Sequence, residues 1–469
     1  MSKNKLYLDV VSHPGRLGVL LFLLPNVFGL LALHSLFWDD WVRPTENTAV
    51  VKYYRVAGFP PWREFLEFSV LQNSPALFHL VTPICFLVAA LALHKVLKAK
   101  LPLTNFQVNA ITLLFLVLPV NSARVAMINF YYAFSYMLFF VAWWLLVSGR
   151  KFVPLLSLPV FWLSFGTSSL LPFFALPLLH FGYLLFSKDR RFDSRILTIW
   201  GALASLPVVF WIVRSQTFGA NVREYYVPKP LGVIRGGLFV LVAVLFLAYG
   251  IVRNRWNMSQ NARPLLIGWG VLSLAFGSAA YMAGGHLVDI SDWMISFVPN
   301  FSDWNSRHQL LQPLGFALIA VGALCGSSDI PSKRPGFFGL SVLIGLSVLL
   351  NFTFSQEYYL DSLKQDEVIE QLAKIEELKF NNQLMISDDA LRFNARGRGL
   401  RSYEWAAILE KAHPNQGKFV VEPLQYVNCG EFKPTLIITI TASNGRLESL
   451  LTRNLGIEIS VTEINTCSE

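Results

Sequence analysis

Charged residues are scarce in this chain of 469 residues. Only 15% of them are Asp, Glu, Lys or Arg, whereas soluble domains carry about a quarter. Hydrophobic residues make up 54% of the chain, and they gather in runs, such as 17–38, that are long enough to cross a hydrocarbon core of about 30 Å as helices. The shortage of charge therefore excludes a soluble protein and predicts an all-α polytopic membrane protein.

Familiar motifs of soluble enzymes are also missing. The chain has neither an HExxH motif nor a CxxC pair, and no GxSxG motif, so it carries no strong metal or nucleophile signature. The glycines of 392–405 lack the spacing and the Lys-Ser/Thr end of a P-loop. The apolar runs hold few ionisable residues, which disfavours an ion-coupled transporter because such proteins bury several near the bilayer midplane.

The net charge of +9 does not indicate nucleic-acid binding. Basic residues concentrate in short loops between the apolar runs, and there is no long basic tail. With the N-terminus in the cytoplasm, every inside loop is basic, as membrane orientation demands. We therefore expect membrane lipids and no nucleic acid as partners, a cytoplasmic N-terminus, and a bacterial inner membrane because the loops are compact.

The apolar runs divide the chain into two parts. A membrane domain, 1–354, contains about eleven predicted spans and a long first outer loop, 38–75. A small extracytoplasmic α/β domain, 355–469, is predicted from segments rich in β-branched residues. The predicted spans are 17–38, 76–97, 106–121, 130–148, 152–166, 169–186, 195–213, 235–252, 264–284, 308–326 and 336–354. In the outer domain a helix is predicted at 361–378 and strands at 383–387, 418–422, 435–443 and 457–464.

One segment of the first outer loop, 60–71, has helical spacing. Trp62 and Phe65 lie on one face, opposite Arg63 and Glu67. This pattern is typical of an amphipathic helix lying on the membrane surface. A helix packed against the other loops is the equal alternative.

Two adjacent carboxylates, Asp39 and Asp40, follow the first apolar run directly. Carboxylates often mark the watery end of a span, and Trp38 and Trp41 suit the interfacial aromatic belt. Alternatively, a partly desolvated carboxylate can have a raised pKa and act as a general base, and the pair could hold a divalent cation such as Mg²⁺ or Mn²⁺. We favour Asp40 as the base, as the more solvent-facing of the two.

Basic residues on the same outer face are candidates for binding an anion. Arg307 and His308 lie at the start of the tenth span, where a guanidinium and a helix N-terminus suit a phosphate; a snorkelling arginine beside ordinary phospholipid is the alternative. Arg396 and Arg398 stand among glycines that let backbone amides approach an anion, or they form a solvated basic turn. The remaining outer candidates are Arg124, Arg223 and Glu224.

Cysteine is rare, with four residues. Cys85 and Cys325 lie in predicted spans and are expected to be packing residues. Cys429 and Cys467 both lie in the outer domain, where an oxidising exterior would let them form a disulfide. Two unpaired thiols are the alternative.

The layout resembles the polytopic glycosyltransferases of the GT-C fold, such as the O-antigen serotype-converting glucosyltransferases. The resemblance rests on the order of spans and loops, on "FWDDW" at 37–41 and on "SRH" at 306–308. It implies a polyprenyl-phosphate sugar donor and an extracytoplasmic glycan or lipid-linked acceptor, with inversion at the anomeric carbon. The second outer loop, "NSARVAMIN", lacks the family's second acidic motif.

The resemblance also implies residue roles. The catalytic acid corresponds to Asp39 or Asp40, which would also hold any divalent cation. The donor phosphate would meet Arg307, His308 and Arg124, and the acceptor or another anion would meet Arg223, Glu224, Arg396 and Arg398. A transporter or flippase of a lipid-linked glycan is the alternative function, and a non-catalytic membrane scaffold is a third.

Overall fold

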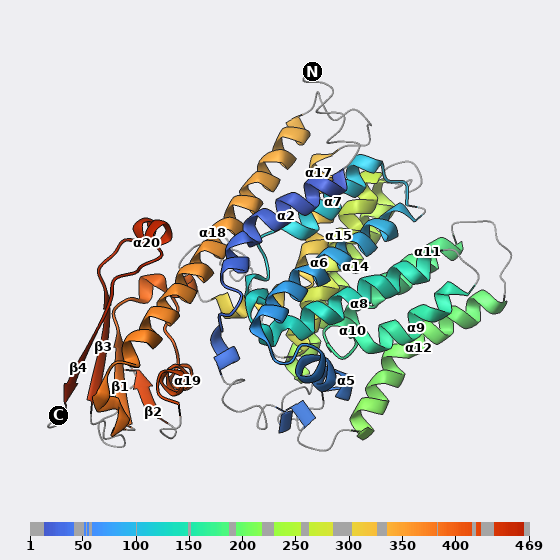
Figure 1. Ribbon diagram of the computed structural model, residues 1–469. Coiled ribbons are helices and arrows are strands. Elements are labelled where there is room, and N and C mark those ends of the chain that lie inside the picture. Colours follow the sequence, from blue (N-terminus) through green and yellow to red (C-terminus); the bar gives the residue numbers. More distant parts are fainter. Residues whose placement is uncertain are drawn as a thin grey trace.

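The computed structural model is mostly helical, with one small sheet at the C-terminal end of the chain (Figure 1). It describes residues 14–41, 51–52, 54–55, 59–99, 101–148, 152–186, 194–217, 229–254, 262–284, 303–325, 335–381, 383–414, 419–423 and 436–463.

Apolar helices occupy the positions of the predicted spans. Within the part of the chain that the structure describes, five of them are long and apolar enough to cross a membrane: α6 (Pro75–Lys98), α8 (Phe130–Val147), α14 (Pro230–Asn254), α15 (Ala262–Ala283) and α18 (Pro335–Leu372). The other apolar helices are α2 (Pro14–Leu31), α7 (Asn105–Val117), α9 (Val153–Ser164), α10 (Leu170–Phe173), α11 (Ala175–Phe186), α12 (Ser194–Thr217) and α17 (Gln312–Leu324). The membrane class is thus supported, and the count of eleven spans stays a prediction.

Two of the central helices are short. α7 and α17 contact each other and have 13 residues each, which corresponds to about 20 Å, less than the hydrocarbon thickness of about 30 Å. Irregular backbone adjoins both at one end of the bundle: η3 (Ser122–Val125) and η4 (Met127–Asn129) after α7, and η5 (Asp303–Gln309) before α17. Within a bilayer such backbone is tolerated only where protein covers it or where it lines a water-filled cavity.

The C-terminal domain is α/β, as predicted. Its sheet has the strand order β2-β1-β3-β4, with β1 parallel to β2 and β3, and β4 antiparallel to β3. The strands are β1 (Gln383–Asp388), β2 (Val420–Pro423), β3 (Leu436–Ala442) and β4 (Ile457–Glu463), and the helices are α19 (Ser402–Ala412) and α20 (Arg446–Thr452).

One helix joins the two parts of the molecule. α18 has 38 residues and is about 57 Å long. It is therefore longer than the hydrocarbon core of a membrane, which is about 30 Å thick. Figure 1 shows it running from the helix bundle to the sheet, where it contacts α19 and β4. The last predicted span and the predicted helix at 361–378 are therefore one continuous helix, without a break at the expected boundary between 354 and 355.

The loop predicted to be the first outer loop contains a short helix, α5 (Pro61–Glu64), followed by a π-helical turn, η2 (Phe65–Val70). Its charged face points inward. Arg63 and Glu67 are buried and paired at 2.8 Å, whereas Phe65 is exposed. Of the two alternatives, the buried charges favour a helix packed against other parts of the protein, because the rings of Tyr54, Phe59 and Tyr131 cover the Arg63 guanidinium.

Candidate functional site

The two adjacent aspartates lie in a short 3-10 helix, η1 (Trp38–Trp41), that follows α2 after the connecting segment 32–37. Trp38 has φ 55°, a left-handed conformation that costs a bulky residue about 1–3 kcal/mol. Packing holds it there, since Trp38 is buried and lies edge-on to Tyr358 at 5.8 Å.

Asp40 is a structural anchor. It is fully buried, and its carboxylate accepts hydrogen bonds from the backbone N–H groups of Met127 at 2.8 Å, Ile128 at 2.9 Å and Phe37 at 3.3 Å. Asp39 is only partly buried. The expectation that Asp40 is the more solvent-facing aspartate is therefore wrong. Its oxygens accept hydrogen bonds from two backbone N–H groups of η4 and so satisfy the buried donors of this irregular segment.

A second set of hydrogen bonds joins η3 to η5. The Ala123 N–H donates to Ser306 Oγ at 2.8 Å, and the Asn121 N–H donates to Gln309 Oε1 at 3.2 Å. η5 carries Arg307, so the acidic motif, the segment between α7 and α8 and the segment before α17 form one connected framework. These contacts link residues more than 180 positions apart in sequence.

Asp39 lies near enough to Arg307 for their charges to interact. Burial lowers the pKa of the Arg307 guanidinium, and the nearby Tyr132, Asp39 and Tyr281 act to raise it. Tyr403 donates its hydroxyl hydrogen to Asp39 Oδ1. We call these five residues, Asp39, Tyr132, Tyr281, Arg307 and Tyr403, the Asp39 cluster.

The C-terminal domain supplies part of this cluster. α19 contacts η1, and Lys411 Nζ lies 5.5 Å from the centre of the Trp41 ring. Burial, and then the hydrogen bond to Asp39, raise the pKa of the Tyr403 hydroxyl. The C-terminal domain thus packs on the acidic motif instead of standing apart from it.

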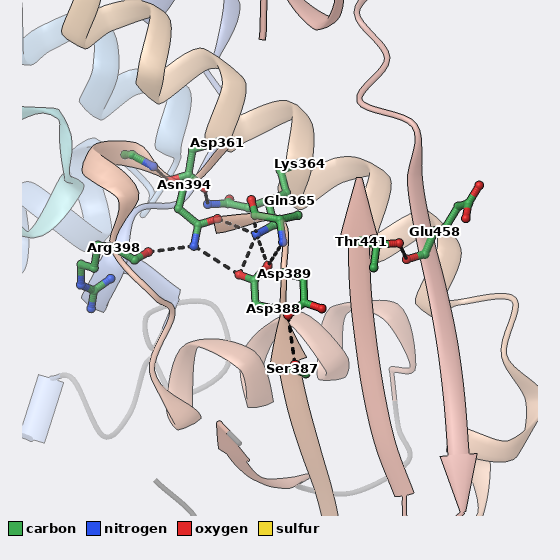
Figure 2. Close-up of polar contacts among 12 residues, drawn as sticks. Asp361, Lys364, Gln365, Ser387, Asp388, Asp389, Asn394, Arg398, Thr441 and Glu458 are labelled. Carbon is green, nitrogen blue, oxygen red and sulfur yellow. Dashed lines mark hydrogen bonds and ion pairs between the residues drawn. The ribbon is translucent and has the colours of Figure 1, made fainter. Parts of the chain in front are cut away.

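A buried polar network ties α18 to the segment that leads into α19 (Figure 2). Lys364 Nζ, on α18, lies 2.6 Å from both carboxylate oxygens of Asp388 and 2.6 Å from Asn394 Oδ1. Asp361, one turn earlier, accepts a hydrogen bond from the Ala395 N–H at 2.9 Å. The segment between β1 and α19 is therefore tied to the helix that comes from the membrane domain.

The two predicted anion-binding arginines of this segment already pair with acids. Arg398 forms a bidentate pair with Glu404 at 2.7 and 3.1 Å, and burial raises the pKa of Glu404 while Arg398 opposes this. Arg396 is buried, with its guanidinium 4.0 Å from the Phe354 ring and 3.8 Å from Glu357. The structure does not bring them together on one surface loop, and the interior position of Arg396 argues against its expected contact with an acceptor.

The three basic residues predicted to bind the donor phosphate do not all share the same surroundings. His308 lies edge-on to Tyr281 at 5.2 Å and so adjoins the Asp39 cluster, next to Arg307. Arg124 instead lies over the rings of Phe22 and Phe86, at 5.5 and 5.2 Å. Arg307 and Arg124 therefore have different neighbours.

A shared cation site on the two aspartates is not favoured, because both Asp40 oxygens already accept backbone N–H groups. Among the described residues, no group of three or more His, Cys, Asp or Glu side chains could hold a metal ion.

Four predicted site residues lie outside the described residues, namely Arg223, Glu224, Cys429 and Cys467. Their predicted roles and the predicted disulfide therefore stay predictions.

Sequence reasoning missed the tyrosines of the Asp39 cluster. Tyr403 lies in "RSYEW", close to the arginines predicted to bind an anion, but no local sequence pattern links it to an aspartate 364 residues away.

In comparisons with known proteins, no family model matches the chain, and neither a curated protein nor a solved structure matches it. The function must therefore be inferred from the geometry of this chain.

Proposed function

We propose that this protein is a membrane glycosyltransferase that moves a sugar from a polyprenyl-phosphate donor to an extracytoplasmic glycan or lipid-linked acceptor. The observation that carries the proposal is the Asp39 cluster. It combines a carboxylate that accepts a hydrogen bond from a hydroxyl with a partly buried guanidinium, at the ends of apolar helices where lipid-linked and water-soluble substrates can meet.

Asp39 acts as the general base in this mechanism. It takes the proton of an acceptor hydroxyl, and the acceptor oxygen attacks the anomeric carbon of the donor sugar. The bond between that carbon and the phosphate oxygen breaks, and its electron pair leaves with the lipid phosphate. A single displacement of this kind inverts the anomeric centre. General-base assistance of this type is worth about 10²–10⁴-fold in rate.

Arg307 stabilises the leaving phosphate. A guanidinium presents two parallel N–H groups to phosphate oxygens, and its effect grows where water is excluded. The partial burial of Arg307 beside Tyr132 and Tyr281 provides such surroundings. His308, its neighbour in sequence, would contribute a second polar group to the same phosphate.

Tyr403 occupies the position expected for the acceptor. Its hydroxyl donates to Asp39 as an acceptor hydroxyl would before deprotonation. An acceptor must therefore displace Tyr403, which a small movement of α19 or a rotation of the tyrosine side chain would allow. Asp40 has a supporting role in this mechanism, because it holds η4 and not the substrate.

The second candidate function is a transporter or flippase of a lipid-linked glycan. One observation favours it, namely that Arg124 lines an apolar pocket between α2, α6 and α18. Reconstitution separates the two functions: purified protein in vesicles is given a polyprenyl-phosphate sugar labelled in the sugar, together with cell-envelope extract as acceptor. A glycosyltransferase moves the label to the acceptor and frees the lipid phosphate, whereas a flippase moves intact lipid between leaflets.

A further inference from the structure

Two leucines stand exposed on α20, the helix that follows β3 in the C-terminal domain. Leu447 is 72% exposed and Leu451 is 78% exposed, and because they are four residues apart they share one face of the helix. Ser449, on the other side of α20, is buried, and Leu450 packs against the core. We call Leu447 and Leu451 the α20 patch, an apolar surface left uncovered by the part of the chain that the structure describes.

α18 indicates where the hydrocarbon core of the membrane ends. Residues 335–356 at its start contain no Asp, Glu, Lys or Arg, and this stretch is about 33 Å long, close to the thickness of about 30 Å of a hydrocarbon core. Within it Leu346 and Leu349 are 53% and 59% exposed, as expected of side chains that face lipid. Glu357 is the first charged residue that follows. We therefore expect the edge of the hydrocarbon core near Glu357, on the side of the C-terminal domain.

α20 lies at this level of α18. Nη2 of Arg446, the first residue of α20, is 3.8 Å from Oε1 of Glu357, and the two helices contact each other. Figure 1 shows α20 beside the middle of α18, with β4 running from there toward the opposite end of the sheet. The α20 patch is therefore close to the place where α18 leaves the hydrocarbon.

Basic side chains adjoin the α20 patch. The side chain of Arg446 is 45% exposed. Arg392, in η8 (Leu391–Phe393), donates from Nη2 to the backbone oxygens of Ala442 at 2.6 Å and Asn444 at 3.1 Å, in the segment that leads into α20. Arginines next to exposed leucines are typical of helices that lie in a membrane interface, since the leucines enter the apolar region while the cations stay at the level of the lipid phosphates.

We propose that α20 is a membrane anchor, with Leu447 and Leu451 inserted into the lipid leaflet on the side of the C-terminal domain. Arg392 and Arg446 lie at the level of the lipid phosphates in this arrangement, and they outnumber Glu448, the acidic residue of α20. The anchor fastens the C-terminal domain to the bilayer at a second place, besides α18. The inference goes beyond the proposed sugar transfer and does not depend on it.

A lipid surface fits the α20 patch better than a protein partner or a second copy of the chain. A stable protein interface buries about 800 Å² on each side, whereas the patch consists of two leucine side chains on a helix of seven residues. Insertion into lipid needs no partner of matching shape, and each apolar side chain that is buried contributes separately. Figure 1 also shows α20 on the side of α18 that faces away from the helix bundle, where lipid covers α18.

Photocrosslinking of the full-length protein in nanodiscs tests the inference. The nanodiscs contain phosphatidylethanolamine and phosphatidylglycerol, and benzoylphenylalanine replaces Leu447 in one protein and Leu451 in another. After irradiation, mass spectrometry identifies what is attached to the α20 peptide. Lipid adducts are expected at both positions, at least tenfold above those formed from position 380. Phe380 is the matched control, because it is 83% exposed and follows the far end of α18.

Hydrogen exchange provides a second measurement. Leu447→Gln and Leu451→Gln combined should make the backbone amides of α20 exchange about tenfold faster in nanodiscs, because a glutamine side chain does not enter the apolar region without cost. Glutamine and leucine have similar helix propensities, so the helix itself is little changed. Phe380→Gln should leave the exchange of α20 as it is in the wild-type protein. Because both leucines are exposed, the thermal unfolding midpoint in detergent should stay nearly unchanged.

Three results would overturn the inference. Crosslinks from Leu447 and Leu451 to a second copy of the chain, in place of lipid, would make the α20 patch a protein interface. Lipid adducts no more frequent than at Phe380 would place α20 in water, and so would equal exchange of α20 in the wild-type and the double-glutamine proteins. All of these measurements are made without substrate, so a failure of the proposed sugar transfer would leave them unchanged.

Discussion

The Tyr403 hydroxyl of the C-terminal domain donates a hydrogen bond to Asp39, in the short helix η1 that follows α2. This contact joins two segments 364 residues apart in sequence. It gives the C-terminal domain a direct place in the chemistry proposed for Asp39. It also distinguishes Asp39 from Asp40, whose carboxylate accepts hydrogen bonds from the backbone of η4.

Removal of the Tyr403 hydroxyl is the first prediction. A hydrogen bond to a charged group contributes about 1.5–3 kcal/mol to the free energy of unfolding. Because Tyr403 is partly exposed, Tyr403→Phe should lower the stability by less than this. Transfer should persist, with an unchanged or lower KM for the acceptor, because the acceptor no longer competes with the tyrosine. Steady-state kinetics at varied acceptor concentration measure this, and a loss of kcat as large as that in Asp39→Asn would make Tyr403 a catalytic residue instead.

Asp40 should behave as a structural residue. Asp40→Ala removes the acceptor of three backbone N–H groups, and each buried donor left unsatisfied costs about 1–3 kcal/mol. We expect a fall in the thermal unfolding midpoint together with a proportional loss of folded, active protein. Asp39→Ala is the matched control, and a large fall in its midpoint with no fall for Asp40→Ala would reverse the two roles.

We expect Lys364, the buried lysine of α18, to hold the segment between β1 and α19 against that helix. Lys364→Met leaves Asp388 buried without its cation, and breaking a buried pair in this way costs about 3–5 kcal/mol. Limited proteolysis between β1 and α19 should become faster. Lys374→Met, which removes an exposed partner of Glu370 on the same segment of chain, should change stability by less than about 1 kcal/mol; equal sensitivity of the two variants would contradict the role given to Lys364.

Arg307 should matter for the donor more than any outer-domain arginine. Arg307→Gln should reduce kcat/KM for the donor by about 10²–10³, the usual loss when one stabilising donor is removed from a developing anion. Arg307→Lys should recover part of it, since charge returns without the fork. Arg453→Gln, at an exposed position after α20, serves as the control, and a similar loss in both proteins would move the donor site elsewhere.

The helices and strands could be predicted because their signals are local. Apolar runs located the helices, and β-branched segments located all four strands of the small sheet. The continuity of α18 could also have been predicted from the sequence, although a domain boundary was placed within it. Between Gly345 and the end of the helix at Leu372 there is no glycine or proline to interrupt it.

The site could be predicted only in part, because its decisive contacts are distant in sequence. Asp39 and Asp40 look equivalent in "FWDDW", and only the N–H groups of η4, 87 and 88 residues away, distinguish them. Likewise, the inward turn of Arg63 follows from Tyr54 and Tyr131 rings that surround it, which no helical periodicity reveals.

The most direct test of the account is a comparison of Asp39→Asn with wild-type protein in paired donor-binding and sugar-transfer assays. The substitution keeps the shape and an acceptor for the Tyr403 hydroxyl but removes the base. We predict transfer about 10²–10⁴-fold slower, with donor binding and the thermal unfolding midpoint nearly unchanged. Transfer at the wild-type rate by Asp39→Asn would contradict the proposed mechanism.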